Sequence, residues 1–487
     1  MPITELMMRL VEQEEMLRLQ RFAKARLAYD GQLLDPLLPT KGDPKGRDNV
    51  KLNFSRLVVD IGVDFLFGVG LDFGKEQEED ATDEDTDVKP KTAPEDQWLE
   101  DAWGYNSKQL LLTDAGINGG ICGHSFIRMA KPTDQTKGFP RLIVIDPATV
   151  TPFHELDDYD DIFAWKIQWN TVDARKGKPA VRRQMITRND QRTAWEIVDE
   201  VAVGMSITGE RNRWWTFSQI ASKWERIGSE VWPYSWSPVF HCKNLPAPNC
   251  FWGTSDLEPD IVDTNDSVNF VLSNMKRIIR NHAHPQPVGH GFNATQVTFG
   301  DGGIIGIPTK DGKLEYLEMK GDLSSSLELY ARLKEAYHEM SRVPEIATGK
   351  VDGIGALSGV ALKLLYGPFA AKTRTKQNLY GHMLSQINAR MLELAGKGED
   401  TVIENRFGNI IPIDDKESAE TATIEEQLGV SRDTLLEKLG YDPFTERKKK
   451  EKEQAAQDAR DAQKMQTEAN IGDQLLNQFD RGRGRGS

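Results

Sequence analysis

Residues 322 to 396 decide the fold, because they join two helix-like patterns through a glycine-rich gap. The joint reads Ser341-Arg342-Val343-Pro344-Glu345, then Gly349-Lys350-Val351-Asp352-Gly353-Ile354-Gly355, then Leu357-Ser358-Gly359-Val360-Ala361-Leu362. Pro344 lacks a backbone donor and pushes Val343 out of the α region, so it ends the first helix. Three glycines within seven residues then oppose regular structure. The stretch predicts a mobile loop between two rigid rods.

Two rods are expected before this loop. Ser255-x-x-Glu258 is a capping-box signature, so a helix is predicted from Ser255 to Asn281, about 40 Å long at 1.5 Å per residue. Ser325 to Ser341 opens with a second such box and predicts the other rod. A narrow seam on the first rod is typical of a face that meets another helix. Its positions are Ile261, Asn265, Val268, Leu272, Met275 and Ile279. Such rods suit a ring of packed helices, and a hairpin within one chain would give the same stripe.

A third helix-like pattern runs from Ser358 to Ala395 after the loop. Gly367 and Pro368 lie inside it, and a proline removes one hydrogen bond of the helix ladder. The pattern therefore predicts a long helix with a kink at these two residues. Smaller helices are expected after residue 415, one of them capped by Ser431.

Residues 98 to 240 predict antiparallel strands that follow a helix at residues 104 to 118. Runs rich in β-branched and aromatic residues are bounded by Asp-Pro, Gly and Asp clusters. The predicted strands are Ser125–Met129, Arg141–Pro147, Phe163–Trp169 and Thr193–Val198. The many tryptophans of this region are interpreted as core, because large aromatic residues on half-buried strands usually pack inward.

The first 96 residues are expected to hold two helices and an acidic insertion. Residues 4 to 29 place leucines among charged residues, as an amphipathic helix does, and Tyr29-Asp30-Gly31 ends it. The apolar stretch from Leu57 to Leu71 is interrupted by acids and glycines, which indicates a buried element rather than a membrane span. Lys75 to Asp96 has ten acids and three bases and little to bury, so a disordered or loosely held loop is predicted.

The composition argues against several classes of protein. A formal net charge of −14 disfavours a tight grip on nucleic acid, because phosphate binding depends on Lys and Arg, although a negative channel can still let DNA pass. Cys122, Cys242 and Cys250 lack CxxC spacing, so neither disulfides nor a zinc site are expected. The Met1 to Arg9 segment does not have the pattern of a signal peptide. We expect no catalytic residues, no cofactor and no metal.

The order of helix, glycine-rich loop and long kinked helix resembles the portal protein of tailed bacteriophages. The motif that carries this resemblance is Val343-Pro344-Glu345 followed by Ser358-Gly359-x-Ala361-Leu362. The N-terminal region repeats the family's order of Tyr29-x-Gly31, Asn53-Phe54 and Leu66-x-Gly68. Ser431-x-x-Thr434, Leu439-Gly440 and Asp442-Pro443 are similar to its C-terminal crown. The resemblance covers most of residues 1 to 450.

The resemblance implies an α+β, portal-type fold with a β-rich wing, a two-helix stem, a small clip, a long kinked helix and a helical C-terminal crown. The implied divisions are wing 1–254 with the acidic insertion 75–96, stem helix 255–281, clip 282–321, second stem helix 322–342, tunnel loop 343–357, long kinked helix and wing return 358–414, crown 415–470 and disordered tail 471–487. In this arrangement the tunnel loop faces DNA through Thr348, Gly349, Lys350, Val351, Asp352, Gly353, Ile354 and Gly355.

The resemblance also implies the function and the partners. The chain would form a ring, usually of twelve subunits, at one capsid vertex of the virion, after assembly in the host cytoplasm. Double-stranded DNA would pass through its channel during packaging and ejection. The implied partners are further copies of the chain, the large terminase subunit, a head-completion or adaptor protein, and the major capsid and scaffold proteins, with no membrane.

The residues alone are also compatible with two other classes of protein. A different structural or scaffold protein of the particle would be mostly helical and would lack the β-rich stretch. A nucleic-acid-processing enzyme would need a reactive cluster, and the sequence offers only diffuse acids such as Asp157, Asp158, Asp160 and Asp161. Four acids within five residues are more often a solvated loop than a metal site.

Overall fold

The computed structural model describes the chain in separate stretches. These are residues 5–32, 48–75, 94–132, 138–172, 177–203, 224–283, 287–290, 298–299, 305–306, 311–316, 323–348, 359–397, 403–410 and 415–438, except 69, 156 and 409, and six positions between 446 and 457. The chain divides into two compact units. The larger contains Met1–Glu79, Thr92–Ala356 and Lys363–Ile410, and the smaller contains Asp80–Lys91, Leu357–Leu362 and Ile411–Ser487.

Helices and one π-helical turn precede the large sheets of the first unit. They are α1 (Glu5–Tyr29), α2 (Phe54–Val63), the π-helical turn η1 (Asp64–Gly68), α3 (Pro94–Tyr105) and α4 (Lys108–Cys122). The single helix predicted at residues 104 to 118 is wrong, because Ser107 adopts a left-handed φ of 54° between α3 and α4. The Asn106 side chain stabilises this break. Its Nδ2 atom donates to the Pro140 carbonyl at 3.0 Å, and its Oδ1 atom accepts from the Leu142 amide at 2.8 Å.

The end of the N-terminal helix is confirmed. Gly31 has a left-handed φ of +68°, and the Gln32 amide donates to the Leu27 carbonyl at 2.9 Å. The acidic insertion is shorter than predicted at both ends, because strand β1 (Leu71–Lys75) pairs antiparallel with β14 (Ile403–Phe407) and α3 already begins at Pro94. Residues 76–93 lie outside the described part of the chain.

Two antiparallel sheets confirm the strand-rich region. One has the order β3-β2-β9 and the other the order β4-β5-β6-β7-β8. The four predicted strands correspond to β2, β3, β5 and β7, and the sequence interpretation missed β4, β6, β8 and β9. Trp165, Trp195 and Trp232 are buried, as expected for core aromatics. The strands are β2 (His124–Ala130), β3 (Arg141–Ile145), β4 (Val150–His154), β5 (Ile162–Val172), β6 (Pro179–Arg188), β7 (Trp195–Val203), β8 (Glu225–Trp232) and β9 (Val239–Lys243).

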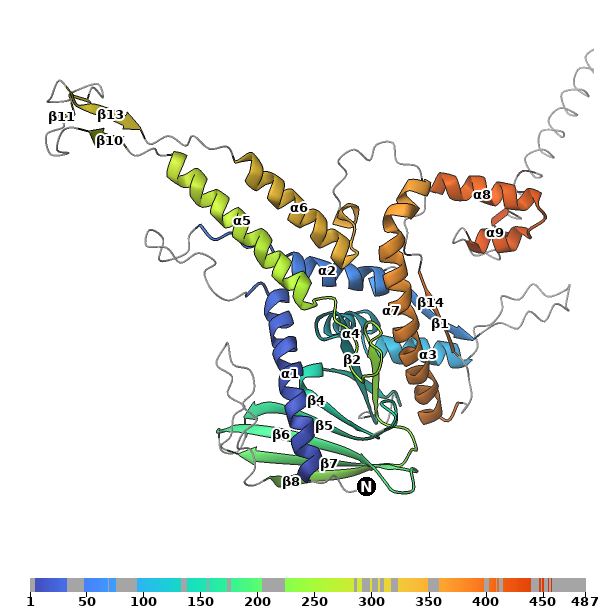
Figure 1. Cartoon of the computed structure of the whole chain (residues 1–487). Helices are drawn as coiled ribbons and strands as arrows, with labels where there is room; N and C mark the ends of the chain where they lie inside the picture. The colour runs from blue at the N-terminus through green and yellow to red at the C-terminus, as the bar shows by residue number, and fades with distance from the viewer. Residues whose placement is uncertain are drawn as a thin grey trace, which may run out of the picture. The chain divides into compact units, whose positions relative to one another are not determined.

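Helix α1 packs along the five-stranded sheet through a buried polar cluster (Figure 1). Glu15 Oε2 lies 3.3 Å from Lys166 Nζ on β5, and both side chains are almost fully buried. Arg18 donates to the carbonyl of Val150 at 3.2 Å and stacks over Trp252, 3.9 Å from the ring centroid. These contacts add to an apolar face made by Leu19, Phe22, Ala25 and Ala28, whereas Leu17 of the predicted leucine pattern is exposed.

The two predicted rods are present and lie side by side as a hairpin (Figure 1). The first, α5 (Pro259–Ala283), begins at Pro259 rather than Ser255, and the second is α6 (Ser324–Ser341). The N-cap of α6 is Leu323, so the capping box predicted at Ser325 does not form. Between the rods lie the short strands β10 (Pro287–His290), β11 (Thr298–Phe299), β12 (Ile305–Gly306) and β13 (Lys313–Tyr316).

The long helix α7 (Gly359–Leu394) follows, with Pro368 inside it as predicted. Aromatic contacts hold it against the π-helical turn η1. The ring centroids of Phe65 and Phe369 are 5.0 Å apart, and those of Phe67 and Tyr380 are 5.5 Å apart.

The described part of the smaller unit consists mainly of α8 (Asp415–Gln427) and α9 (Arg432–Lys438). The predicted Ser431 cap is confirmed, because its Oγ atom accepts from the Thr434 amide at 3.3 Å. Leu435 is buried, while Ile424 and Leu428 are exposed.

Gly119 allows α4 and α7 to approach closely. A Cβ atom at this position would lie 1.8 Å from the Oη atom of Tyr380, and Tyr380 is fully buried. The hydroxyl group cannot move aside without disturbing the core, so the contact depends on glycine.

We predict that Gly119→Ala destabilises the protein by about 1–3 kcal/mol through overpacking. Gly104, inside α3, is the matched control, because a Cβ atom there meets nothing within 4 Å among the described residues. Gly104→Ala should stabilise by about 0.5–1 kcal/mol, as alanine does in a helix interior. Urea unfolding measures both, and an unchanged Gly119→Ala variant would contradict the close contact.

Candidate functional site

The loop predicted to face DNA begins at the end of a described element. Thr348 is the last residue of the 3₁₀ turn η4 (Glu345–Thr348), and its Oγ1 atom donates to the Glu345 carbonyl at 2.6 Å. The other predicted loop positions lie outside the described residues. These are Gly349, Lys350, Val351, Asp352, Gly353, Ile354 and Gly355. Their role stays a prediction.

The seam predicted on the first rod is largely covered within the chain itself. Leu272 is half-buried, and Ile279 is 52% exposed. The remaining positions, Ile261, Asn265, Val268 and Met275, are buried. The stripe therefore does not require a neighbouring subunit over its first four turns.

Polar side chains of α5 bind the segment that leads into α2, residues 50–54, which we call the strap. The Val50 amide donates to Ser273 Oγ at 2.8 Å. Asn269 pairs with both backbone groups of Leu52, accepting at 2.7 Å and donating at 3.1 Å. The Phe54 amide donates to Asn265 Oδ1 at 3.1 Å. The three α5 positions are four residues apart, and a helical turn nearly matches two residues of extended chain, so every second backbone group of the strap finds a partner.

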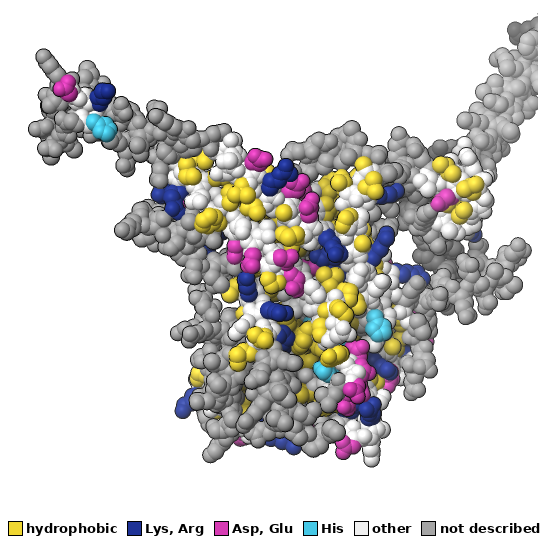
Figure 2. Space-filling model, viewed as in Figure 1, with side chains coloured by type: hydrophobic (Ala, Val, Ile, Leu, Met, Phe, Trp, Pro, Cys, Tyr) yellow, Lys and Arg dark blue, Asp and Glu magenta, His cyan; other side chains and the backbone are white. Residues whose placement is uncertain are grey.

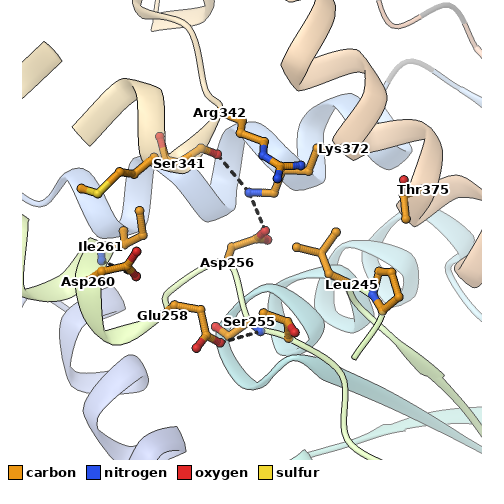
Figure 3. A pocket seen from close by; sticks show the side chains of 13 residues that line it. Leu245, Ser255, Asp256, Glu258, Asp260, Ile261, Ser341, Arg342, Lys372 and Thr375 are labelled. Carbon is orange, nitrogen blue, oxygen red and sulfur yellow. Dashed lines mark hydrogen bonds and ion pairs between the residues drawn. The ribbon is translucent and has the colours of Figure 1, made fainter. Parts of the chain in front are cut away.

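A buried cluster of charges joins both rods to α7, and we call it the charged joint (Asp256, Lys372 and Lys376; Figure 3). The Asp256 carboxylate precedes α5 and lies between two lysines one turn apart on α7. Its Oδ1 atom is 2.9 Å from Lys372 Nζ, and its Oδ2 atom is 2.5 Å from Lys376 Nζ. Lys372 Nζ also donates to the carbonyl of Ser341, the last residue of α6, at 3.1 Å. One lysine thus binds the ends of both rods.

The three charged groups are almost completely removed from water. Their side chains are 1%, 9% and 4% exposed, in the order Asp256, Lys372, Lys376. Burial alone raises the pKa of the Asp256 carboxyl, but the charges and hydrogen bonds of the two lysines outweigh it and hold this pKa at about 2. Burial lowers the pKa of Lys376, and Asp256 opposes that shift. The joint is therefore an ion cluster at neutral pH.

The end of α4 sets the position of Asp256. The Asp256 amide donates to the Gly120 carbonyl at 2.8 Å. Ser255 Oγ donates to the carbonyls of Gly120 and Ile121, each at 2.8 Å. Gly120 leaves room for the carboxylate, because a Cβ atom there would lie 3.2 Å from Asp256 Oδ2. Local backbone geometry thus presents the acid to α7.

A cavity of about 420 Å³ opens beside the charged joint (Figure 3). Its charged lining is mixed in sign: Arg342 and Lys372 are basic, and Asp256, Glu258 and Asp260 are acidic. Two of these acids are engaged locally, since Glu258 accepts from the Ser255 amide and Asp260 from the Ile261 amide. This balance does not favour an anion or a cation.

A histidine pair, of which His124 is fully buried and His241 is half-buried, holds the loop that leads into the charged joint. His124 Nε2 and His241 Nδ1 are 3.1 Å apart, and the Gly253 amide donates to His124 Nδ1 at 3.4 Å. Burial lowers the pKa of both imidazoles, that of His241 to about 4, and the nearby cations Lys243 and Arg18 act in the same direction on His124. Both rings are neutral at pH 7.

Reactive groups are not assembled into a catalytic set in the described chain. Asp161, in the acidic cluster, is paired with Arg188 at 2.6 Å and with Arg192 at 3.3 Å. Burial raises the pKa of the Cys122 thiol to about 12, which keeps it protonated and unreactive. Within the described residues, no three metal-ligating side chains gather. No described helix is both long and apolar enough to cross a bilayer.

The sequence interpretation missed the charged joint. Lys372 and Lys376 show the four-residue spacing of one helix face, and Asp256 directly follows a recognised capping residue. Nothing in the sequence brings positions more than 110 residues apart together, so only the fold reveals their contact.

We predict that Asp256→Asn destabilises the protein by about 3–5 kcal/mol, because it leaves two buried ammonium groups without a counter-charge. Asp263→Asn is the matched control on the same rod. Asp263 is 64% exposed and pairs with Lys24 at 2.7 Å, so its loss should cost at most about 1 kcal/mol. Chemical unfolding with both variants tests this, and equal costs would contradict the joint.

We also predict a loss of stability in mild acid. A histidine whose folded pKa is lowered contributes stability above its unfolded pKa of about 6.5, and that contribution falls as the pH drops towards 4. The loss should reach about 2 kcal/mol per buried histidine by pH 5. Replacing His124 and His241 by Gln should flatten the dependence of unfolding free energy on pH between 6.5 and 5. An unchanged slope would assign the acid sensitivity to other groups.

Comparison with known proteins gives one family match. The family model described as "Phage portal protein, SPP1 Gp6-like" matches residues 208–465. No curated protein matches the chain.

Several solved particle structures show weak similarity to this chain. The neck of a native gene transfer agent (GTA) particle computed with C12 symmetry is 12% identical, with a TM-score of 0.43, over 86% of this chain and 94% of that chain. The virion of a native GTA particle is 12% identical, with a TM-score of 0.43, over 86% of this chain and 93% of that chain. The neck of an empty GTA particle computed with C6 symmetry is 12% identical, with a TM-score of 0.46, over 80% of this chain and 90% of that chain.

The family match spans more than half of the chain. It includes both rods, all three residues of the charged joint, and the whole of α7. The chain belongs to the SPP1 Gp6-like family of phage portal proteins.

Proposed function

We propose that this chain forms a closed ring of twelve subunits at one vertex of a phage capsid, and that double-stranded DNA enters and leaves through the ring. The observation that carries the proposal is the family match over residues 208–465. The strands, the hairpin of rods and α7 follow in the order expected for wing, stem and long helix.

The structure supports a passive and rigid role for the stem. The rods are fixed to each other by packing, to the strap by hydrogen bonds, and to α7 by the charged joint. A tube built from such hairpins transmits load without changing shape, because each rod end has a buried ionic anchor. The energy for packaging then comes from a partner, the large terminase subunit.

Residues 282–321 are proposed as the clip that docks the terminase and later the adaptor protein. This segment joins the ends of α5 and α6 that lie away from the charged joint, and its described parts are short paired strands. The wing, residues 1–254, would seat the ring in the shell of major capsid and scaffold proteins. The net charge of −14 suits a conduit, since a mostly negative wall limits adhesion of the DNA backbone.

The first residues of the proposed tunnel loop, 343–357, are held by α6. The His338 Nδ1 atom lies 2.9 Å from the Val343 carbonyl, and Lys334 pairs with Glu345. After the loop, Pro368 removes one hydrogen bond from α7 four residues before Lys372 of the charged joint.

A DNA-packaging assay tests the function directly. Procapsids assembled with the wild-type protein should protect DNA from nuclease, and procapsids assembled without it should not. Replacing Gly353 and Gly355 by Pro, or deleting residues 350–354, should leave ring assembly intact and impair packaging or retention, because the loop loses its conformational freedom. Lys397→Ala, at an exposed position after α7, is a control that should package normally. Normal filling by the loop variants would remove the tunnel assignment.

A further inference from the structure

The contact between neighbouring rods needs a surface that the chain has not already used. The strap occupies the face of α5 that carries Asn265, Asn269 and Ser273, and the seam is buried over most of its length. A contact between subunits presupposes the ring proposed above. Figure 2 shows hydrophobic side chains among acidic ones over the two rods.

Phe270 and Ile279 are the large apolar side chains that α5 leaves open, and Phe270 lies in the middle of the helix. It is 42% exposed, although the next residue on the strap side, Asn269, is buried. At about 100° per residue, Phe270 lies about 140°, 100° and 60° around the helix from the strap-binding residues Asn265, Asn269 and Ser273. It precedes the buried Met275 by five residues and so points away from that side too. Phe270 thus forms a knob on the outer edge of the hairpin.

The opposite edge of the hairpin carries a groove. A hollow of about 620 Å³ lies between α6 and α7. Its apolar lining comes from Tyr330, Ala331, Pro344, Leu365 and Pro368. Leu365 is 47% exposed, so the groove presents apolar surface to water. Monomeric proteins seldom leave such surface open without a partner.

Some of the charges at the groove are paired within the chain, and Glu339 and Arg342 line it as well. Glu335 pairs with Arg332 at 3.1 Å, and Glu345 pairs with Lys334. His338 has its Nδ1 atom on the Val343 carbonyl. The groove therefore suits an aromatic side chain better than a charged one.

The strap fixes the level of the knob relative to the groove. Phe54 binds Asn265 through its amide, and its ring centroid is 5.6 Å from that of Tyr337. Asn265 and Tyr337 therefore lie at about the same height on two antiparallel rods. Five residues farther along α5 is Phe270, and five residues back along α6 is Arg332, next to Ala331. Subunits related by rotation about an axis parallel to the rods have each residue at the same position along that axis. Phe270 of one subunit therefore lies level with Ala331 of the next.

We propose that Phe270 of one subunit packs into the groove of the next subunit, beside Tyr330 and Ala331. The partner is a second copy of this chain, because knob and groove lie at opposite edges of one hairpin and at one height. A contact between two different surfaces of identical chains repeats around a ring and closes it. The contact uses the outer edge of α5 in place of the predicted seam.

Cysteine pairs test the contact in the full-length protein. Phe270→Cys with Ala331→Cys should give a ladder of disulfide-linked chains on oxidation, seen on a non-reducing gel. The control pair joins Phe270→Cys with Leu329→Cys, which has a similar height but lies on another face of α6 and is 51% exposed. The control should give about tenfold less cross-linking, because a disulfide needs Cα atoms within about 7 Å. Single-cysteine variants measure the background from Cys250, since Cys122 and Cys242 are buried.

A charge substitution provides the second readout. Phe270→Asp should convert rings to smaller species in native mass spectrometry, and each chain should stay folded, because the residue is exposed within one chain. Phe270→Leu should keep the rings. Rings that persist in Phe270→Asp, or equal cross-linking of the two cysteine pairs, overturn this contact and leave the ring itself standing. A wild-type protein that never forms rings overturns both.

Discussion

The ion pairs of Asp256 with Lys372 and Lys376 are the constraint on which the arrangement of the rods depends. Removing three charges from water is costly unless each finds partners at close range. The cluster meets that condition only when the start of α5, the end of α6 at Ser341 and the middle of α7 are in their observed places. If any of these three elements is displaced, a buried charge loses its partner of opposite sign. The joint therefore favours one arrangement of the three elements.

The charged joint, the strap and the aromatic contacts of Phe65 and Phe67 fix the rods and the C-terminal portion of α7 relative to one another. The 3₁₀ turn that ends at Thr348 follows the second rod, and Pro368 precedes Lys372 of the joint in α7.

The sequence predicted what local patterns encode, and the rest depends on contacts between distant residues. Hydrophobic period and the breakers Pro344 and Gly31 gave α1, α6 and α7, and the β-rich runs gave four strands. Asn106 shows where this fails, because the break between α3 and α4 is stabilised by backbone groups more than 30 residues away. The seam of α5 was interpreted as a helix contact, yet Asn265 binds the backbone of Phe54. For the candidate site, the sequence pattern predicted only the loop and the position of Pro368. No local pattern around Asp256 indicated that Lys372 and Lys376 are its partners.

Electron microscopy of the purified full-length protein tests the central claim most directly. The account predicts closed rings with an axial hole, in which each subunit contributes the α5–α6 hairpin to the wall of the channel. Class averages that show the same rotational symmetry in every ring would agree with one repeated contact between two edges of the hairpin. A population of compact single chains, or open filaments without closure, would contradict it.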